Sequence, residues 1–443
     1  MNRPQEATSY RRILIVAWPI IVSSISVPML ALVDTAVIGN LGDAALLGAI
    51  AIGGMIFNFI YWGFGFLRMG TTGLIAQAVG REQWYEVRAI LYRAGLLGIL
   101  IGFTLVLLQS LIATAAFSVI DGSTFVESAA FEYFRIRICG APISLANLAI
   151  IGFLIGCQDT RRLLIIQVGV NLLNIVLDLL FVIVLDMSVI GVALASVLAE
   201  IFALGLGIAF LIGRLRRQGL ALRPRWSEVW QPKALLRMVA VNRDIMIRTL
   251  SLTFGFAWFT NQGAASGDIT LAANTVLMQF VTFSAFFLDG IALATESLVG
   301  QAVGARRRQA VERIIALSTH LSFATAVLMA IVIYLCGSLV ISLLTNVVEV
   351  QEFAATYFLW AVAAPVISVW CYLLDGVFIG ATRTAEMRNA MVASLVIFLA
   401  IWWLTTPLGN HGLWLSLMTY YAARSGTLYF YLPGLIRSVE NGD

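Results

Sequence analysis

Long apolar segments, repeated along the whole chain, are the feature that most restricts how these 443 residues can fold. Each of twelve such runs is long enough for the roughly 20 residues that a membrane-spanning helix requires. Hydrophobic residues make up 60% of the chain and charged residues 12%, a balance that the surface of a water-soluble protein could not hide. The runs are too long and too uniformly apolar for the alternating strands of a membrane β-barrel. We therefore predict an all-α integral membrane protein with twelve transmembrane helices.

The predicted helices fall into two sets of six, separated by the longest polar stretch. The first set lies at about 13–39, 46–73, 90–112, 128–155, 163–185 and 189–213. The second set lies at about 237–264, 270–299, 314–344, 353–381, 388–407 and 412–436. These positions predict an N-terminal six-helix lobe at 1–213, a linker at 214–236 and a C-terminal six-helix lobe at 237–443.

Arginines alternate between successive joints of the predicted helices. Basic residues occupy the N-terminal segment, every second joint and the central linker, as at Arg81, Arg161, Arg306 and Arg383, whereas the joints between them have none. Because cytoplasmic loops of membrane proteins are enriched in Lys and Arg, both termini and the linker are expected in the cytoplasm. This multi-pass pattern suits a bacterial inner membrane.

The two halves share short sequences in the same order. Gln77-Ala78-Val79-Gly80 recurs as Gln301-Ala302-Val303-Gly304, and Ala141-Pro142 recurs as Ala364-Pro365. Repeats of equal topology, related by an axis along the membrane normal, are typical of transporters with a substrate path between the halves. The alternative is chance similarity in a restricted apolar alphabet.

Residue counts argue against enzymatic, metal and nucleic-acid functions. The only lysine, Lys233, does not follow the glycine-rich turn of a P-loop. The two histidines, His320 and His411, lack the spacing of metal ligands, and the four cysteines form no CxxC. We therefore expect no enzyme, no bound cofactor or metal centre and no nucleic-acid partner.

Polar residues inside the apolar segments of the first half indicate a cation site. Asp34 lies in the first segment, Asn174 and Asp178 share one face of the fifth, and Ser196 and Glu200 repeat that spacing on the sixth. Ionisable groups at membrane depth are costly and usually functional. Together these groups could hold a proton or Na⁺. The alternatives are a helix-end cap at Asp34 and hydrogen bonds that only join helices.

Two further features are prolines that could bend the first helix and acids in the apolar segments of the second half of the chain. Pro19 and Pro28 each remove a backbone hydrogen bond from the first helix and predict kinks. Acids of the second half also lie in apolar segments, and Asp375 could pair with Arg248 in either a structural or a functional role. The candidates on the C-terminal substrate path are Asp289, Glu296, Asp375 and Arg248.

The chain resembles the multidrug and toxic compound extrusion (MATE) family, and in particular its DinF-like branch. The resemblance rests on the twelve segments and on motifs along nearly the whole chain. These include Leu32-Val33-Asp34-Thr35, Asn242-Arg243-Asp244-Ile245, Leu288-Asp289-Gly290, Ala294 to Gln301 and Asp375 to Thr384. It implies a MATE-type fold and cation-coupled export of drugs by alternating access. It also implies that Asp34, Asn174, Asp178 and Ser196 form the cation site of the N-terminal lobe.

We expect a proton-coupled antiporter that exports lipophilic, mostly cationic compounds, with Asp34 and Asp178 as coupling acids. Carboxylates would have to carry the protons, because histidine is almost absent. Na⁺ coupling at the same residues is one alternative, and export or flipping of lipid-like molecules or metabolites is another. The expected partners are the substrate and the bilayer, and we expect a monomer.

Overall fold

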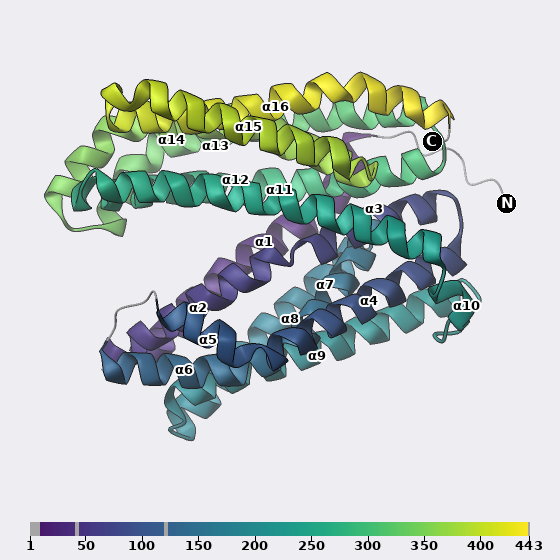
Figure 1. The fold of residues 1–443 in the computed structure, drawn as a ribbon, viewed down its shortest axis with the longest axis horizontal. Helices are drawn as coiled ribbons and strands as arrows, with labels where there is room; N and C mark the ends of the chain where they lie inside the picture. The colour runs from purple at the N-terminus through teal and green to yellow at the C-terminus, as the bar shows by residue number, and fades with distance from the viewer. Residues whose placement is uncertain (1–8, 40–43, 119–122, 442–443) are drawn as a thin grey trace. The chain divides into compact units, whose positions relative to one another are not determined.

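A computed structural model describes residues 9–39, 44–118 and 123–441, with every side chain in these ranges except 27–39, 44 and 441. Within these ranges the chain forms helices and no β-strand (Figure 1). The predicted all-α class is therefore confirmed.

Each of the twelve predicted segments corresponds to one helix or to a broken helix. In the first half the helices are α1 (Tyr10–Gly39), α2 (Ala44–Gly63), α3 (Phe66–Gly80), α4 (Trp84–Leu107), α5 (Gln109–Phe117), α6 (Thr124–Cys139), α7 (Ala141–Gly156), α8 (Thr160–Asp178), the π-helix η1 (Leu179–Val184), α9 (Ser188–Arg217) and α10 (Trp226–Val229). In the second half they are α11 (Pro232–Ala265), α12 (Asp268–Gly304), α13 (Arg308–Leu344), α14 (Val348–Gly380), α15 (Thr384–Thr405), the 3₁₀-helix η2 (Thr406–Leu408) and α16 (Asn410–Asn441).

Eight helices of the described part are long and apolar enough to cross a membrane, and the bent pair α6–α7 makes a ninth. The pair bends by 53° where α6 ends and Pro142 occupies the first turn of α7. Pro suits a first helical turn because its missing N–H would have no partner there. Helices α11 and α16 are not among these nine, and their sequences are less uniformly apolar: each carries a buried arginine, Arg248 on α11 and Arg424 on α16.

Contacts divide the chain into two compact units. Residues 22–239 form one, here called the N-terminal unit; residues 1–21 with 240–443 form the other, the C-terminal unit. The first part of α1 therefore belongs with the C-terminal unit, where Tyr10 Oη lies 3.0 Å from His320 Nδ1 on α13. The predicted lobes at 1–213 and 237–443 stay a prediction, because contact density does not define a lobe that folds alone.

The internal repeat is visible in the backbone of four turns. Residues Glu82, Gln158, Arg306 and Thr382 have φ between 54° and 59°. Each stands two residues after the last residue of a helix, and the next N–H donates across the turn at 2.8–3.0 Å, as from Gln83 N to Ala78 O and from Arg307 N to Ala302 O. This bond pattern is that of a helix-ending Schellman turn. The turns after α3 and α7 thus match those after α12 and α14.

Close helix packing is also shared between the halves. A Cβ atom on Gly152 of α7 would lie 2.7 Å from Arg68 O of α3, and one on Gly376 of α14 would lie 2.4 Å from Ala292 O of α12. Since real Cβ atoms do not approach that closely, only glycine permits these contacts. The equivalent positions of both glycines confirm that the repeated sequence encodes a repeated structure.

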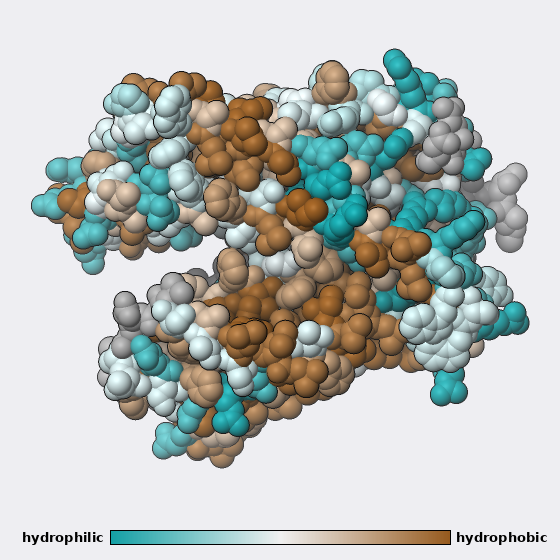
Figure 2. Space-filling view, viewed as in Figure 1, coloured by the Kyte–Doolittle hydropathy of each residue, from teal (hydrophilic) through white to brown (hydrophobic). Residues whose placement is uncertain are grey.

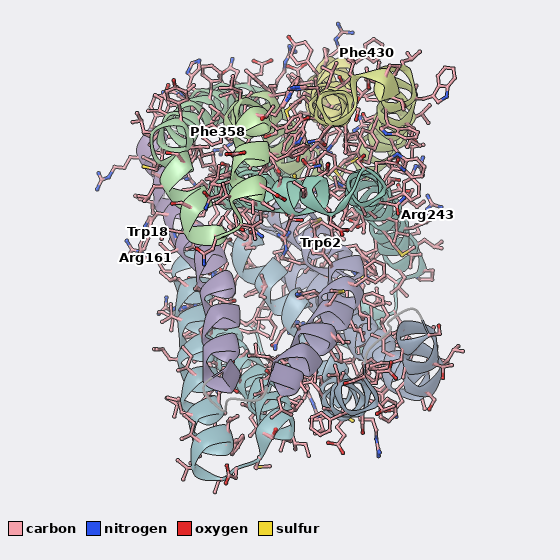
Figure 3. All side chains as sticks on the ribbon, turned by 90° about the vertical axis from the view of Figure 1, so that its left-hand side faces the viewer. Trp18, Trp62, Arg161, Arg243, Phe358 and Phe430 are labelled. Atoms are coloured by element: carbon pink, nitrogen blue, oxygen red, sulfur yellow. The ribbon has the colours of Figure 1, made fainter. Side chains whose placement is uncertain are left out.

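Large apolar side chains cover much of the outer surface of each unit (Figure 2). Leu107 of α4 is 83% exposed and Phe430 of α16 is 81% exposed, and Figure 3 shows Phe430 on the outside of its helix. Exposed apolar surface of this extent marks contact with a membrane. The chain is therefore a membrane protein.

Candidate functional site

The polar residues of α8 form one continuous stripe. Gln167, Asn171, Asn174 and Asp178 follow one another at intervals of three or four residues, which places them on one helix face. Asn171, Asn174 and Asp178 are buried, and Asp178 has no exposed surface. The sequence predicted Asn174 and Asp178 but missed Gln167 and Asn171, although the same spacing could have identified them.

Hydrogen bonds connect this stripe to neighbouring helices. Gln167 Nε2 donates to Asn171 Oδ1 at 3.2 Å, and Asn171 Nδ2 donates to Ser26 O of α1 at 3.1 Å. With its amide turned to satisfy both neighbours, Asn174 donates to Asp178 Oδ2 at 3.3 Å and accepts from the backbone N–H of Ser196 at 3.2 Å. The stripe therefore joins α1, α8 and α9 through polar contacts.

Three of the four predicted N-terminal site residues lie together in this arrangement. Asn174 contacts both Asp178 and Ser196, and the contribution of Ser196 to that contact is its backbone amide. The side chains of Asp34 and Pro28 lie outside the described part of the chain, although both positions belong to helix α1. Helix α1 also continues through Pro19, which is buried.

The backbone changes form directly after Asp178. Helix α8 ends at this residue, and the π-helix Leu179–Val184 follows without a break. A π-turn is wider than an α-turn and occurs frequently at functional sites. Nothing in the sequence pattern signals this change, because the residues after Asp178 are uniformly apolar. Asp178 is therefore a buried acid beside an irregular turn.

Glu200 of α9, a half-buried acid, has close partners on neighbouring helices. Arg137 Nη1 lies 2.8 Å from Glu200 Oε1, and Ser144 Oγ also bonds the carboxylate. The guanidinium of Arg137 further lies over the ring of Phe57, 5.5 Å from its centre. A charge held by an ion pair and a hydroxyl is neutralised in place. Arg137 of α6 and Glu200 of α9 therefore form an ion pair between two helices.

In the C-terminal unit, Asp375 is held between two arginines. Arg248 of α11 bonds Asp375 Oδ2, and Arg424 Nη2 of α16 lies 2.8 Å from the same atom. All three residues are buried. The pair Arg248–Asp375 is confirmed, whereas the sequence analysis did not foresee that Arg424 joins it. The cluster is a three-helix ion bridge with more positive than negative charge.

The remaining acids of this unit differ in burial and in their partners. Glu296 lies on α12 and is 1% exposed, whereas Asp289, also on α12, is exposed. Asp244 of α11 lies 2.7 Å from Arg388 Nη1 and 3.0 Å from Arg243 Nη2. The described residues contain no group of three or more His, Cys, Asp or Glu that could hold a metal ion.

The chain is a helical membrane protein with two structurally repeated halves, and acids are buried in both halves. These are the features of a membrane transporter built from internal repeats. The MatE family model matches residues 19–180 and again 245–407. The chain therefore belongs to the MatE family, whose members are transporters and not enzymes. The double match follows the internal repeat seen in the turns and glycines.

Individual relatives agree with this assignment. The chain is 42% identical over 416 residues to "DNA damage-inducible protein F" of Escherichia coli (strain K12), covering 93% of this chain and 89% of the relative. It is 25% identical over 456 residues to "Probable multidrug resistance protein NorM" of Thermotoga maritima, covering 97% and 94%. Its fold matches the structure titled "Outward-facing conformation of a multidrug resistance MATE family transporter of the MOP superfamily" with a TM-score of 0.87 at 18% identity, covering 97% and 96%. The resemblance to MATE transporters and to the DinF-like branch is confirmed.

Proposed function

We propose that this transporter exports lipophilic, mostly cationic compounds in exchange for protons, with Asp34 and Asp178 as the coupling acids. The observation that carries the proposal is the complete burial of Asp178 next to an amide. An ionised carboxylate away from water is costly, and a proton relieves that cost. Asp178 can therefore alternate between a protonated buried form and an ionised form that faces water.

The partners of the acids support this choice. Glu200 and Asp375 each pair with a guanidinium from another helix and so connect helices within their units. Asn174, which lies beside Asp178, is a neutral group that can bond either the protonated or the ionised form of the acid.

The amide of Asn174 could serve either ion. With its nitrogen toward Asp178 it bonds the acid and the Ser196 backbone, and with its oxygen toward Asp178 it offers one of the several oxygen ligands that a hard cation needs. We propose H⁺ because carboxylates must carry any protons in a chain with almost no histidine. Na⁺ coupling at Asp34, Asn174, Asp178 and Ser196 remains the alternative. Export or flipping of lipid-like molecules or metabolites is the second alternative.

The energy available from coupling is sufficient for drug export. One charge that crosses about 100 mV supplies roughly 2.3 kcal/mol, which corresponds to about a 50-fold concentration ratio per proton. Alternating access between the two repeated halves would expose the site to each side in turn. We further propose a bacterial inner membrane with both termini in the cytoplasm, from the alternation of arginines. No resident cofactor is required, and we propose a monomer.

The test is export of a fluorescent lipophilic cation from reconstituted vesicles under an imposed pH gradient, with and without sodium. The variants are Asp34→Asn and Asp178→Asn, and the matched control is Glu349→Gln, an exposed acid at the start of α14. We expect sodium-independent export in the wild type and control and none in either site variant. Full pH-driven export by Asp178→Asn would refute the assignment, and a strict sodium requirement would replace H⁺ with Na⁺. Absence of export for every such cation would refute the proposed substrate class.

A further inference from the structure

A cavity of about 270 Å³ lies in the N-terminal unit, away from the Asp178 site. Its walls come from the end of α3, the start of α4 and the start of α11. The candidate spans Ala45–Gly80 and Trp84–Leu107 end and begin at this point. The cavity therefore opens where two apolar spans meet the polar joint between them.

The lining of this cavity is strongly basic. Its basic residues are Arg81, Arg93, Lys233 and Arg237, and its one acidic residue is Glu86, 2.7 Å from Arg93. The guanidinium groups of Arg81 and Arg237 both donate to Gln77 Oε1, each at 3.1 Å. Two cations thus converge on one neutral oxygen. An anion with several oxygens would match these planar donors better than a single amide does.

A rigid wall supports the basic groups. The side chain of Arg93 is 2% exposed and bonds Glu86, the Val229 carbonyl at 2.9 Å and the Glu228 carbonyl. Arg88, five residues earlier on α4, holds the same polar segment through the Ala221 carbonyl at 2.8 Å. These two buried arginines fix the segment between α9 and α11 against α4. The cavity is therefore a preformed site.

The remaining lining indicates what kind of anion would fit. Leu74, Ile90 and Met238 also face the cavity, so an apolar group can lie beside the basic one. The equivalent turn in the second half has Ala305 where this turn has Arg81, and helix α13 has Leu317 where α4 has Arg93. Arg93 holds the segment between α9 and α11, but the repeated turn does not require Arg81, whose guanidinium converges with that of Arg237 on one oxygen. This pair therefore points to a ligand.

We propose that this basic cavity binds a phosphate-bearing anion at the membrane surface. Two sources share that chemistry: the headgroup of an acidic phospholipid, whose acyl chains would continue along Leu74 and Ile90, and a free phosphate or phosphate ester. Basic pockets between membrane helices bind phospholipid headgroups in this manner. The site is separate from the proposed coupling acids, so neither proposal depends on the other.

The only lysine of the chain gives a direct readout, because Lys233 lines the cavity. The purified protein in maltoside detergent is titrated with dihexanoylphosphatidylglycerol or with inorganic phosphate. Acylation of Lys233 by an uncharged N-hydroxysuccinimide ester is followed by peptide mass spectrometry. We expect one of the two anions to protect Lys233 in a saturable manner. If only the lipid protects Lys233 from acylation, the ligand is a phospholipid headgroup. If inorganic phosphate protects Lys233 at the same concentration, the ligand is a soluble anion.

The variant Arg81→Gln with Arg237→Gln removes the two converging guanidinium groups. At about fivefold per basic side chain, the concentration needed for protection should rise roughly 25-fold. Arg307→Gln with Arg313→Gln, two exposed arginines of the other half, is the matched control and should leave protection unchanged. Arg237→Gln alone, at an exposed position, provides the test if the double variant does not fold. Protection by neither anion, or equal protection in all variants, would overturn the proposal.

Discussion

Replacing Asp375 by Asn tests the three-helix ion bridge of the C-terminal unit. The side chains of Asp375, Arg248 and Arg424 are 8%, 9% and 2% exposed, so water cannot take the place of the lost charge. Asp375→Asn keeps the size of the side chain and one acceptor oxygen but leaves two buried guanidinium groups without a counter-charge. Removing one partner of a buried ion pair costs about 3–5 kcal/mol.

For a unit of about 200 residues, this loss corresponds to a melting temperature lower by on the order of 10 °C. The assay is thermal unfolding of the purified protein in detergent, with Glu349→Gln on the same helix as control. Adding Arg424→Met to Asp375→Asn removes one of the excess charges and should restore part of the lost stability. A decrease of the melting temperature by less than about 2 °C for Asp375→Asn would refute the interpretation of Asp375 as a stabilising counter-ion. A further decrease on adding Arg424→Met would refute it as well.

Two further perturbations test the helix packing and the polar segment. Gly380→Val should lower the melting temperature and the yield of folded protein, because even a Cβ at Gly380 would lie 2.2 Å from the Glu296 carbonyl; equal stability to the wild type would contradict the close approach of α12 and α14. Arg88→Gln should speed tryptic cleavage between α9 and α11, because Arg88 bonds Glu228 at 2.7 Å and the Ala221 carbonyl. Gel analysis of timed digests measures the rate, with Ser227→Ala at an exposed position of the same segment as control; equal rates would show that Arg88 does not hold the segment.

Much of the helical framework could be predicted from the sequence, because apolar length and helical spacing are local properties. The breaks inside predicted spans were harder to find. The bend between α6 and α7 depends on how Pro142 begins a new helix, and the π-helix after Asp178 lies in a uniformly apolar run. Neither feature changes the hydrophobicity on which the span prediction rests.

Apart from the pair Arg248–Asp375, long-range partners could not be predicted. The spacing of Asn174 and Asp178 placed them on one helix face, but it could not show that Asn174 would bond the backbone of Ser196. Similarly, no local pattern indicates that Arg424 joins Arg248 on one oxygen of Asp375. Such contacts depend on which helices pack together, and apolar segments of similar composition do not specify their neighbours.

The most direct test of the central claim is whether a substrate gradient by itself drives proton movement through Asp178. Vesicles that contain the transporter, a pH-sensitive dye and a lipophilic cation are diluted into sodium-free buffer that lacks this lipophilic cation, with no initial pH gradient. The account predicts proton flux opposite to the cation in the wild type, and none in Asp178→Asn vesicles that still bind the cation. Equal proton flux in both, or cation release without proton movement in the wild type, would contradict it.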